Sequence, residues 1–260
     1  MVSKIFRIAP IIVLASLGLS SAAWATCSNA SVNGIYGFLI SGTNASGNPV
    51  RILGQAAFNS TTATFKGEET GSINGGTFPF VSISGTYAVA SNCTGAGKIT
   101  INSKTQNFYF VVTSAGLRVV SGKTGDTQAG FIVAQGSESC TNVGIKGNFG
   151  VESAGIFLTG APSILGPVAF VGELLFNVNA SGAGVIGGHI AGSENGTIFT
   201  FTQTPVTGSY SVNANCTGTA TITPQGKSAL NYSFVVVNSG KELLAVETDE
   251  HTVVSGTLQR

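Results

Sequence analysis

The chain of 260 residues carries few charges: Asp, Glu, Lys and Arg make up 9% of it, against a usual share of about 25%. Twelve Lys and Arg stand against eleven Asp and Glu without a polybasic cluster, which argues against nucleic acid as a partner, because that binding needs clustered cations. After the first 25 residues no apolar run reaches the ~18 residues of a membrane-spanning helix, so we expect no transmembrane helix there.

The first 25 residues have the three parts of a secretory signal peptide. Cations at positions 4 and 7 precede an apolar run over residues 8–19, and Ala23-Trp24-Ala25 supplies a small-residue cleavage site. We expect cleavage after Ala25 and a mature protein that is secreted or periplasmic, with ten cations against eleven carboxylates. A lipid anchor on Cys27 is the alternative, but Thr26 before that cysteine fits peptidase cleavage better.

Short segments in which apolar and polar residues alternate follow one another along the rest of the chain. A period of two indicates strands with one buried face, and no segment keeps a helical period. In the first half we predict strands over residues 34–40, 51–58, 65–69, 81–89, 99–101, 108–112, 117–120 and 130–133. In the second half we predict them over residues 147–151, 172–176, 185–191, 206–213, 220–222, 232–236, 243–246 and 253–258. We assign the thirty-six glycines to turns, bulges and barrel bends.

The two halves are copies of one another. Gly85-Thr-Tyr-Ala-Val-Ala-Ser-Asn-Cys-Thr-Gly95 returns as Gly208-Ser-Tyr-Ser-Val-Asn-Ala-Asn-Cys-Thr-Gly218, and the strong hairpin signal Asn-Gly occurs at 74–75 and at 195–196. We therefore predict an all-β protein of two tandem antiparallel up-and-down eight-stranded β-barrels, repeat 1 over residues 26–138 and repeat 2 over residues 139–260. A sandwich, a single sixteen-stranded ring and an outer-membrane barrel are the alternatives.

Each copy carries one pair of cysteines, which we expect to be oxidised in an exported protein. In an up-and-down meander, a residue before the first strand and one after the fourth lie at the same end of the sheet. This topology favours the pairs Cys27–Cys93 and Cys140–Cys216 over the other two pairings. Two histidines without a Cys-x-x-Cys motif argue against a metal site, and no motif indicates a cofactor.

Aromatic residues on the inward parity are the candidates for a ligand site. If the barrels are hollow, these rings line a cavity for one small apolar ligand; if the rings fill the barrels, the protein is a scaffold. The candidate residues are Tyr36, Phe38, Tyr87, Phe108, Phe110, Phe149, Phe176, Tyr210, Tyr232 and Phe234.

Glu173 is the charged residue that we consider for the barrel interior. It lies in an apolar strand where the first copy has Gln55. If it points inward, desolvation favours its protonated form and it can act as an acid or anchor a ligand. The commoner arrangement is an outward, solvated carboxylate, and parity does not decide between the two. Asp249, Glu250 and His251 are consecutive, and because successive side chains diverge we expect them to form a surface turn.

The pattern G-x-Y-x-V-x-x-x-C-T-G, followed by F-x-V-V and a closing V-V-S-G-T, resembles that of uncharacterised secreted bacterial proteins built from tandem β-barrel repeats. Their repeat is similar at fold level to the allene oxide cyclase barrel and to lipocalin-like barrels. The resemblance covers both copies and implies two barrels. It carries over no active-site residue, because no catalytic motif of the cyclase is matched here.

We favour an exported, non-catalytic protein that binds a small apolar ligand inside a barrel. The first alternative is a structural or cell-surface interaction protein with solid barrels. The second is a cyclase- or isomerase-like enzyme that uses a buried carboxylate such as Glu173. No nucleophile, base and orienting acid can be assembled into a hydrolase site.

Overall fold

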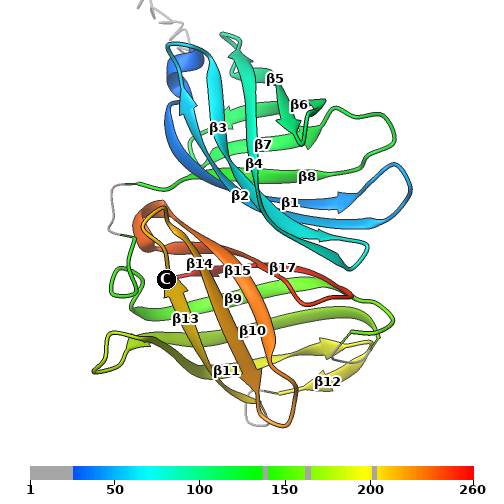
Figure 1. The fold of residues 1–260 in the computed structure, drawn as a ribbon, viewed down its shortest axis with the longest axis vertical. Helices are drawn as coiled ribbons and strands as arrows, with labels where there is room; N and C mark the ends of the chain where they lie inside the picture. Colours follow the sequence, from blue (N-terminus) through cyan, green and yellow to red (C-terminus); the bar gives the residue numbers. More distant parts are fainter. Residues whose placement is uncertain (1–25, 137–139, 162–164, 201–203) are drawn as a thin grey trace, which may run out of the picture.

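A computed structural model describes residues 26–136, 140–161, 165–200 and 204–260, and the predicted signal peptide lies outside them. The chain is all-β and forms two closed antiparallel barrels, one above the other in Figure 1. The first barrel consists of β1 (Gly34–Thr43), β2 (Pro49–Asn59), β3 (Thr64–Ile73), β4 (Gly76–Val89), β5 (Thr94–Ile101), β6 (Lys104–Thr113), β7 (Gly116–Ser121) and β8 (Ala129–Ala134). Each strand pairs with the next, and β8 pairs with β1 to close the ring.

The second barrel repeats this meander and adds one short strand. It consists of β9 (Gly147–Phe157), β10 (Gly166–Val178), β11 (Gly184–Glu194), β12 (Thr197–Phe199), β13 (Pro205–Val212), β14 (Thr217–Pro224), β15 (Leu230–Val237), β16 (Glu242–Glu247) and β17 (Thr252–Gln259). The pairing of β17 with β9 closes the ring of eight strands. The strand that the sequence did not predict, β12, pairs with β11 beyond the point where β13 leaves it. The structure therefore has two rings of eight strands and excludes the alternative of a single ring of sixteen.

Turn residues explain how the strands reverse. Asn74 and Gly75 have φ angles of 52° and 78°, and Asn195 and Gly196 have φ angles of 46° and 83°. A left-handed conformation at both central positions matches the twist of a two-residue hairpin, which is why Asn-Gly occurs at both turns. Two short 3-10 helices, η1 (Asn29–Ser31) and η2 (Asn238–Gly240), complete the described elements.

Many glycines lie inside strands, opposite an inward aromatic ring on the neighbouring strand. Gly95 pairs with Phe110 and Gly97 pairs with Phe108, and a methyl group on either glycine would overlap the facing ring. Gly218 has the same relation to Phe234 in the second barrel. The expectation that the glycines lie in turns, bulges and bends is therefore incomplete, because inward rings also need glycines on the neighbouring strand against which they lie.

The same short motif closes one end of each barrel. Asn29 accepts a hydrogen bond from the Val89 amide, at 2.8 Å, and Asn142 accepts the corresponding bond from Val212, at 2.9 Å. Three residues after each asparagine stands a fully buried aliphatic residue, Val32 in the first barrel and Ile145 in the second, which packs into the core.

Disulfides Cys27–Cys93 and Cys140–Cys216 tie the segment before each barrel to the turn after its fourth strand, with Cα atoms 4.9 and 4.8 Å apart. Both predicted pairs are confirmed. In the chain-entropy model, loops of this length contribute about 3 to 5 kcal/mol each to stability. Two disulfides are compatible with an extracellular or periplasmic protein. Within the described residues there is no helix of the length and hydropathy that a membrane crossing requires.

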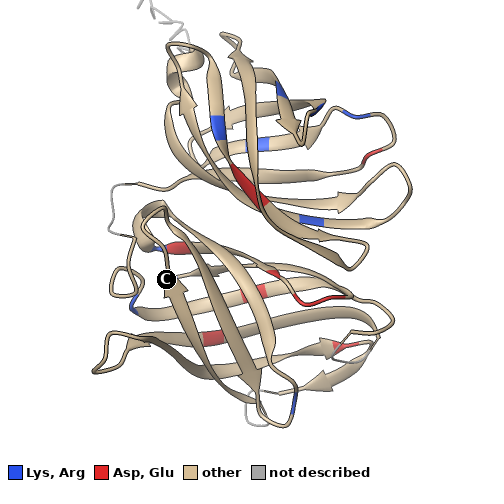
Figure 2. Cartoon of the chain, viewed as in Figure 1, with Lys and Arg blue, Asp and Glu red and all other residues tan. Residues whose placement is uncertain are grey.

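The barrels pack against one another through an apolar cluster made of outward-facing side chains. β1 and β2 contribute Leu39 and Leu53, and the second barrel contributes fully buried side chains from β15 and β16: Val235, Val237, Leu244 and Val246. Both faces of β15 and β16 are therefore buried, one in the barrel core and one in this interface, which explains why their sequences do not alternate. Charges are sparse on both barrels (Figure 2).

Polar contacts surround this apolar cluster. Gln135 donates a hydrogen bond to Gln55, which donates one to Glu68, both at 2.9 Å. Across the interface, Asn215 also donates to Glu68, at 2.8 Å, and the His251 amide donates to the Gly75 carbonyl, at 2.7 Å. The two barrels are thereby held in one arrangement by direct contacts in addition to the chain that connects them.

Gly37 on β1 allows the barrels to approach closely. A Cβ atom at this position would lie 2.5 Å from Val237 Cγ1 and 2.8 Å from Val235 Cγ1. We expect Gly37→Val to lower the free energy of unfolding by roughly 1 to 3 kcal/mol, because the interface is overpacked. The matched control is Gly150→Val on β9, where a Cβ would meet, of the described atoms, only the Gln259 backbone oxygen at 3.7 Å.

Urea denaturation of the wild type and both variants measures this difference. The control should stay within about 0.5 kcal/mol of the wild type. Equal stability of Gly37→Val and Gly150→Val would contradict the close packing of β1 on the second barrel.

Candidate functional site

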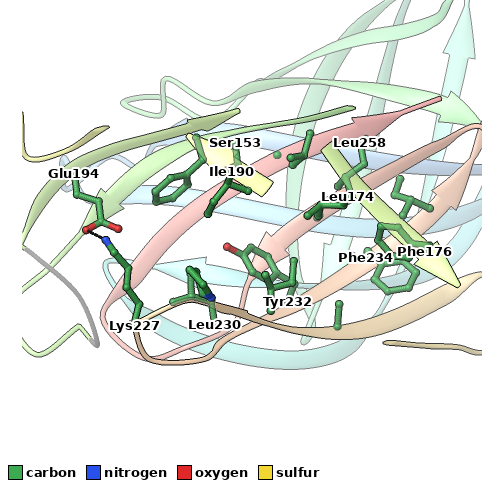
Figure 3. Close-up of a pocket in the computed structure, with 18 of the residues that line it drawn as sticks. Ser153, Leu174, Phe176, Ile190, Glu194, Lys227, Leu230, Tyr232, Phe234 and Leu258 are labelled. Carbon is green, nitrogen blue, oxygen red and sulfur yellow. Dashed lines mark hydrogen bonds and ion pairs between the residues drawn. The ribbon is translucent and has the colours of Figure 1, made fainter. Parts of the chain in front are cut away.

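A small cavity lies inside each barrel. The second barrel's cavity measures about 60 Å³ and is bordered by rings and aliphatic side chains, with four charged or hydroxyl-bearing residues: Ser153, Glu194, Lys227 and Tyr232. In Figure 3, Phe176 and Phe234 lie together at one end of this space, and Glu194 and Lys227 lie at the other. The interior is thus apolar at its closed end and polar near the β11–β12 turn.

An ion pair covers the polar end of this cavity. Lys227, from the β14–β15 turn, donates to Glu194 at the end of β11, and the lysine also lies 4.7 Å from the centroid of the Phe199 ring. Glu194 is only 3% exposed, so its charge depends on these nearby partners. Phe199 belongs to β12, and the extra strand therefore supplies part of this cover.

A second buried carboxyl group belongs to the same barrel. Glu247 on β16 is fully buried, and Tyr232 on β15 donates a hydrogen bond to its Oε2 atom at 3.4 Å, whereas Oε1 is buried without a described partner. Burial raises the pKa of Glu247 to about 8, and the nearby Asp249 carboxylate adds to the rise. Burial also raises the pKa of Tyr232 well above its ordinary value. At neutral pH, Glu247 therefore holds a proton.

The first barrel has a cavity of about 70 Å³ with one buried carboxyl group on its wall. Glu69 on β3 is 5% exposed, and burial raises its pKa to about 7. No side chain or backbone group of the described residues forms a hydrogen bond to it. Counted back from the Asn-Gly turns, its counterpart in the second barrel is Ile190, which also borders a cavity. The first barrel thus has an acid where the second has a hydrocarbon.

The predicted aromatic residues all lie in the two cores. Phe38, Tyr87 and Phe110 are buried in the first barrel, with Tyr36 and Phe108 packed against them. The corresponding core of the second barrel contains the buried Phe149, Phe176, Tyr210 and Phe234, with Tyr232 packed against them. Their role in ligand binding stays a prediction, although five of them, Phe38, Phe108, Phe176, Tyr232 and Phe234, border a cavity directly.

Glu173 does not enter the barrel interior. It is exposed on the outer side of β10, like Val171 on the same strand, whereas Leu174 and Phe176 point inward. The inward orientation considered for it is therefore corrected, because the parity of β10 turns its even positions inward. His251 lies in the exposed turn before β17, as expected for the segment 249–251.

Sequence reasoning missed the buried acids and the lysine that pairs with one of them. Glu69 could have been found, because it shares the parity of the inward Phe65 on β3. Glu247 could not, since both faces of β16 are apolar and show no alternation. The contact between Glu194 and Lys227 joins two turns 33 residues apart, and no local pattern indicates it.

No protein-family model and no curated protein matches this chain. Membership of the group of secreted tandem-barrel proteins stays a prediction, as does the likeness to allene oxide cyclase and lipocalin-like barrels. The function therefore has to be inferred from the geometry of the two barrels.

The buried groups can hold and release protons near neutral pH, but they reach little space. Among the described residues, no group of three or more His, Cys, Asp or Glu side chains could hold a metal ion. The cavities, about 60 and 70 Å³, are several times smaller than the roughly 300–1,000 Å³ of an ordinary ligand pocket. The chemistry that the geometry supports is therefore proton binding by carboxyl groups in a solid interior.

The raised pKa values of Glu247 and Glu69 predict that stability falls as pH rises. Below the ordinary value of 4.5 both groups are protonated in the folded and unfolded chain, and the full stability is present. Between 4.5 and about 8 the unfolded chain releases protons that folded Glu247 retains, so the free energy of unfolding decreases. We expect a loss on the order of a few kcal/mol over this range.

Chemical denaturation at a series of pH values measures this slope. Glu247→Gln should flatten it and make the protein more stable than the wild type at pH 8. The exposed control Glu173→Gln should keep the wild-type slope. An unchanged slope in Glu247→Gln would contradict the burial of a protonated carboxyl at this position.

Breaking the ion pair at the end of the second barrel should destabilise the fold. Lys227→Met keeps the length of the side chain but removes the cation from the buried Glu194, and we expect a loss of roughly 1 to 3 kcal/mol. The double variant Lys227→Met with Glu194→Gln should recover most of this loss, because the buried charge is removed as well. If Lys227→Met and the double variant had the same urea midpoint, the ion pair would not contribute to the stability of the fold.

Proposed function

We propose that this is an exported, non-catalytic structural or interaction protein, whose barrels are filled and whose outer faces make its contacts. One observation carries the proposal: the internal cavities measure only about 60 and 70 Å³. Ligand pockets usually measure about 300–1,000 Å³, and an engineered cavity that admits benzene measures about 150 Å³. An apolar carrier would need several times the space that these barrels contain.

The packing of the rings is the reason that the barrels are solid. In the first barrel, Phe58 contacts Tyr36, Phe65 and Tyr87, with ring centroids 5.0 to 5.5 Å apart. In the second, Phe176 contacts Phe149 and Tyr210 at 5.3 and 5.0 Å. These rings come from consecutive strands, β1 to β4 and β9 to β13, and they fill the inner side of that part of each barrel. A ligand carrier of the lipocalin type, which the sequence analysis favoured, therefore has less support than the solid scaffold.

Exposed apolar side chains on the outer surfaces support a contact function. Tyr109, Val111 and Val120 lie together on neighbouring strands of the first barrel, and Val171 and Leu175 lie on β10 of the second. Clustered apolar residues on an outer surface commonly mark an interaction site. Export is supported by the two disulfides and by the signal-peptide pattern of residues 1–25.

An enzyme of the cyclase or isomerase type has less support. Glu173, the acid considered for this role, is exposed on the outer surface. The acids that are buried, Glu69 and Glu247, have pKa values suited to acid–base chemistry. Glu69 borders a cavity of only about 70 Å³, and Glu247 is not among the residues that line the cavity of the second barrel. Their proton binding is better explained as a consequence of burial.

Native mass spectrometry of the protein purified from its own export route tests the proposal. We expect the mass of the unliganded polypeptide, with no gain after incubation with fatty acids or aromatic hydrocarbons. Ala220→Leu serves as the control, because Ala220 borders the second cavity and a larger side chain there closes it. A stoichiometric apolar ligand that binds the wild type and is lost in Ala220→Leu would replace the scaffold with a carrier.

A further inference from the structure

The interface within the chain joins two different faces of the repeated barrel. We call the outer side of the first three strands of a barrel its front face, and the outer side of the last three strands its back face. The front face of the first barrel (β1–β3) contacts the back face of the second (β15–β17). Because the two faces differ, the contact leaves the front face of the second barrel (β9–β11) and most of the back face of the first (β6–β8). On that back face, Phe131 and Val133 of β8 already pack against the interface cluster, so the free part consists of β6 and β7.

These two remaining faces expose large apolar residues. On the back face of the first barrel, Tyr109 is 53% exposed and Val120 is 45% exposed. On the front face of the second, Val171 is 50% exposed and Leu175 is 44% exposed. Tyr109, Val111 and Val120 border an open groove of about 740 Å³, which residues 88–90 and 94–96 also line.

Strand register shows that the exposed apolar residues occupy interface positions. Leu39 pairs with Leu53 on the buried front face, and Glu152 pairs with Val171 at the same place on the exposed one. Leu244 pairs with Val235 on the buried back face, and Arg118 pairs with Val111 on the exposed one. Val171 and Val111 are thus the counterparts of Leu53 and Val235, two fully buried members of the interface cluster.

No contact within the described chain requires a glycine at position 150 on the exposed front face. Its counterpart Gly37 must be glycine, because Val235 and Val237 of the second barrel press against it. At Gly150 a Cβ would meet, of the described atoms, only one backbone oxygen, at 3.7 Å, and its φ is not in the left-handed region. A neighbour that presses there as the second barrel presses on Gly37 would explain the glycine.

Two positions that are leucine inside the interface are oppositely charged on the exposed faces. Glu152 stands in the place of Leu39, and Arg118 stands in the place of Leu244. Leu39 and Leu244 belong to the same apolar cluster. If the same contact formed between two chains, Glu152 of one would lie in the same cluster as Arg118 of the other.

We propose that a second copy of this chain docks on these faces, so that the front face of the second barrel packs on the back face of the first barrel of the next copy. The contact repeats the arrangement already present within the chain, with a Glu152–Arg118 pair added. Such a head-to-tail contact is heterologous and generates a filament, or a ring if the rotation closes. The inference rests on the proposed function and names its partner.

Sedimentation velocity of the full mature protein over a concentration series, at low salt, tests this proposal. We expect association beyond a dimer that weakens as salt is raised, since an exposed charge pair is screened. Glu152→Arg alone and Arg118→Glu alone should each weaken association by at least about tenfold, because two like charges then meet at every contact. The double variant, Glu152→Arg with Arg118→Glu in one chain, should restore it.

Gly150→Leu provides a second variant that is independent of charge. The added side chain has open space in the single chain, so the free energy of unfolding should stay at the wild-type value while association is lost. A wild type that stays monomeric up to about millimolar concentration, or a double charge variant no better than the single ones, would overturn the head-to-tail contact. Neither result affects the proposal that the barrels are filled, because that proposal is contradicted only by a bound apolar ligand.

Discussion

The packing of inward rings against strand glycines is the constraint on which both barrels depend. Phe110 lies over Gly95, Phe108 over Gly97 and Phe234 over Gly218, each across one pair of neighbouring strands. A Cβ on these glycines would push the ring into the core, and a smaller residue in place of the ring would leave a void that costs several kcal/mol. The pair Gly95–Phe110 of the first barrel returns as Gly218–Phe234 in the second, whereas Gly97–Phe108 is replaced by Ala220–Tyr232.

The small volume of the two cavities limits the chemistry that can take place inside the barrels. The rings leave cavities of about 60 and 70 Å³, so the buried acids Glu69 and Glu247 have little space for a reactant beside them. They remain protonated near neutral pH and make the fold sensitive to pH. The outer faces are different: one front face and one back face already form a contact inside the chain, and the second pair carries apolar residues at the same positions.

Much of the fold could be read from the sequence, and less of the site. The copied motif around Tyr87 and Tyr210, the alternating strands and the paired cysteines indicated two closed barrels with a disulfide in each, and the structure confirms this. Glu173 was considered for the interior, but β10 turns it outward. Glu247 escaped notice because β16 is buried on both faces, and Lys227 because its partner Glu194 lies on a distant turn.

Periodicity, turn residues and the repeat determined by themselves that the chain forms two antiparallel barrels, because these are local signals that each strand carries in its own residues. Only the tertiary structure decided how little space the barrels enclose, since this depends on how rings from several strands pack against one another. The structure alone also showed which outer face of each barrel is covered. The outward valines of β6 and β15 have the same sequence context, but Val111 is exposed and Val235 is buried. The reason is that the first barrel packs on Val235, whereas no part of the described chain packs on Val111 in the same way.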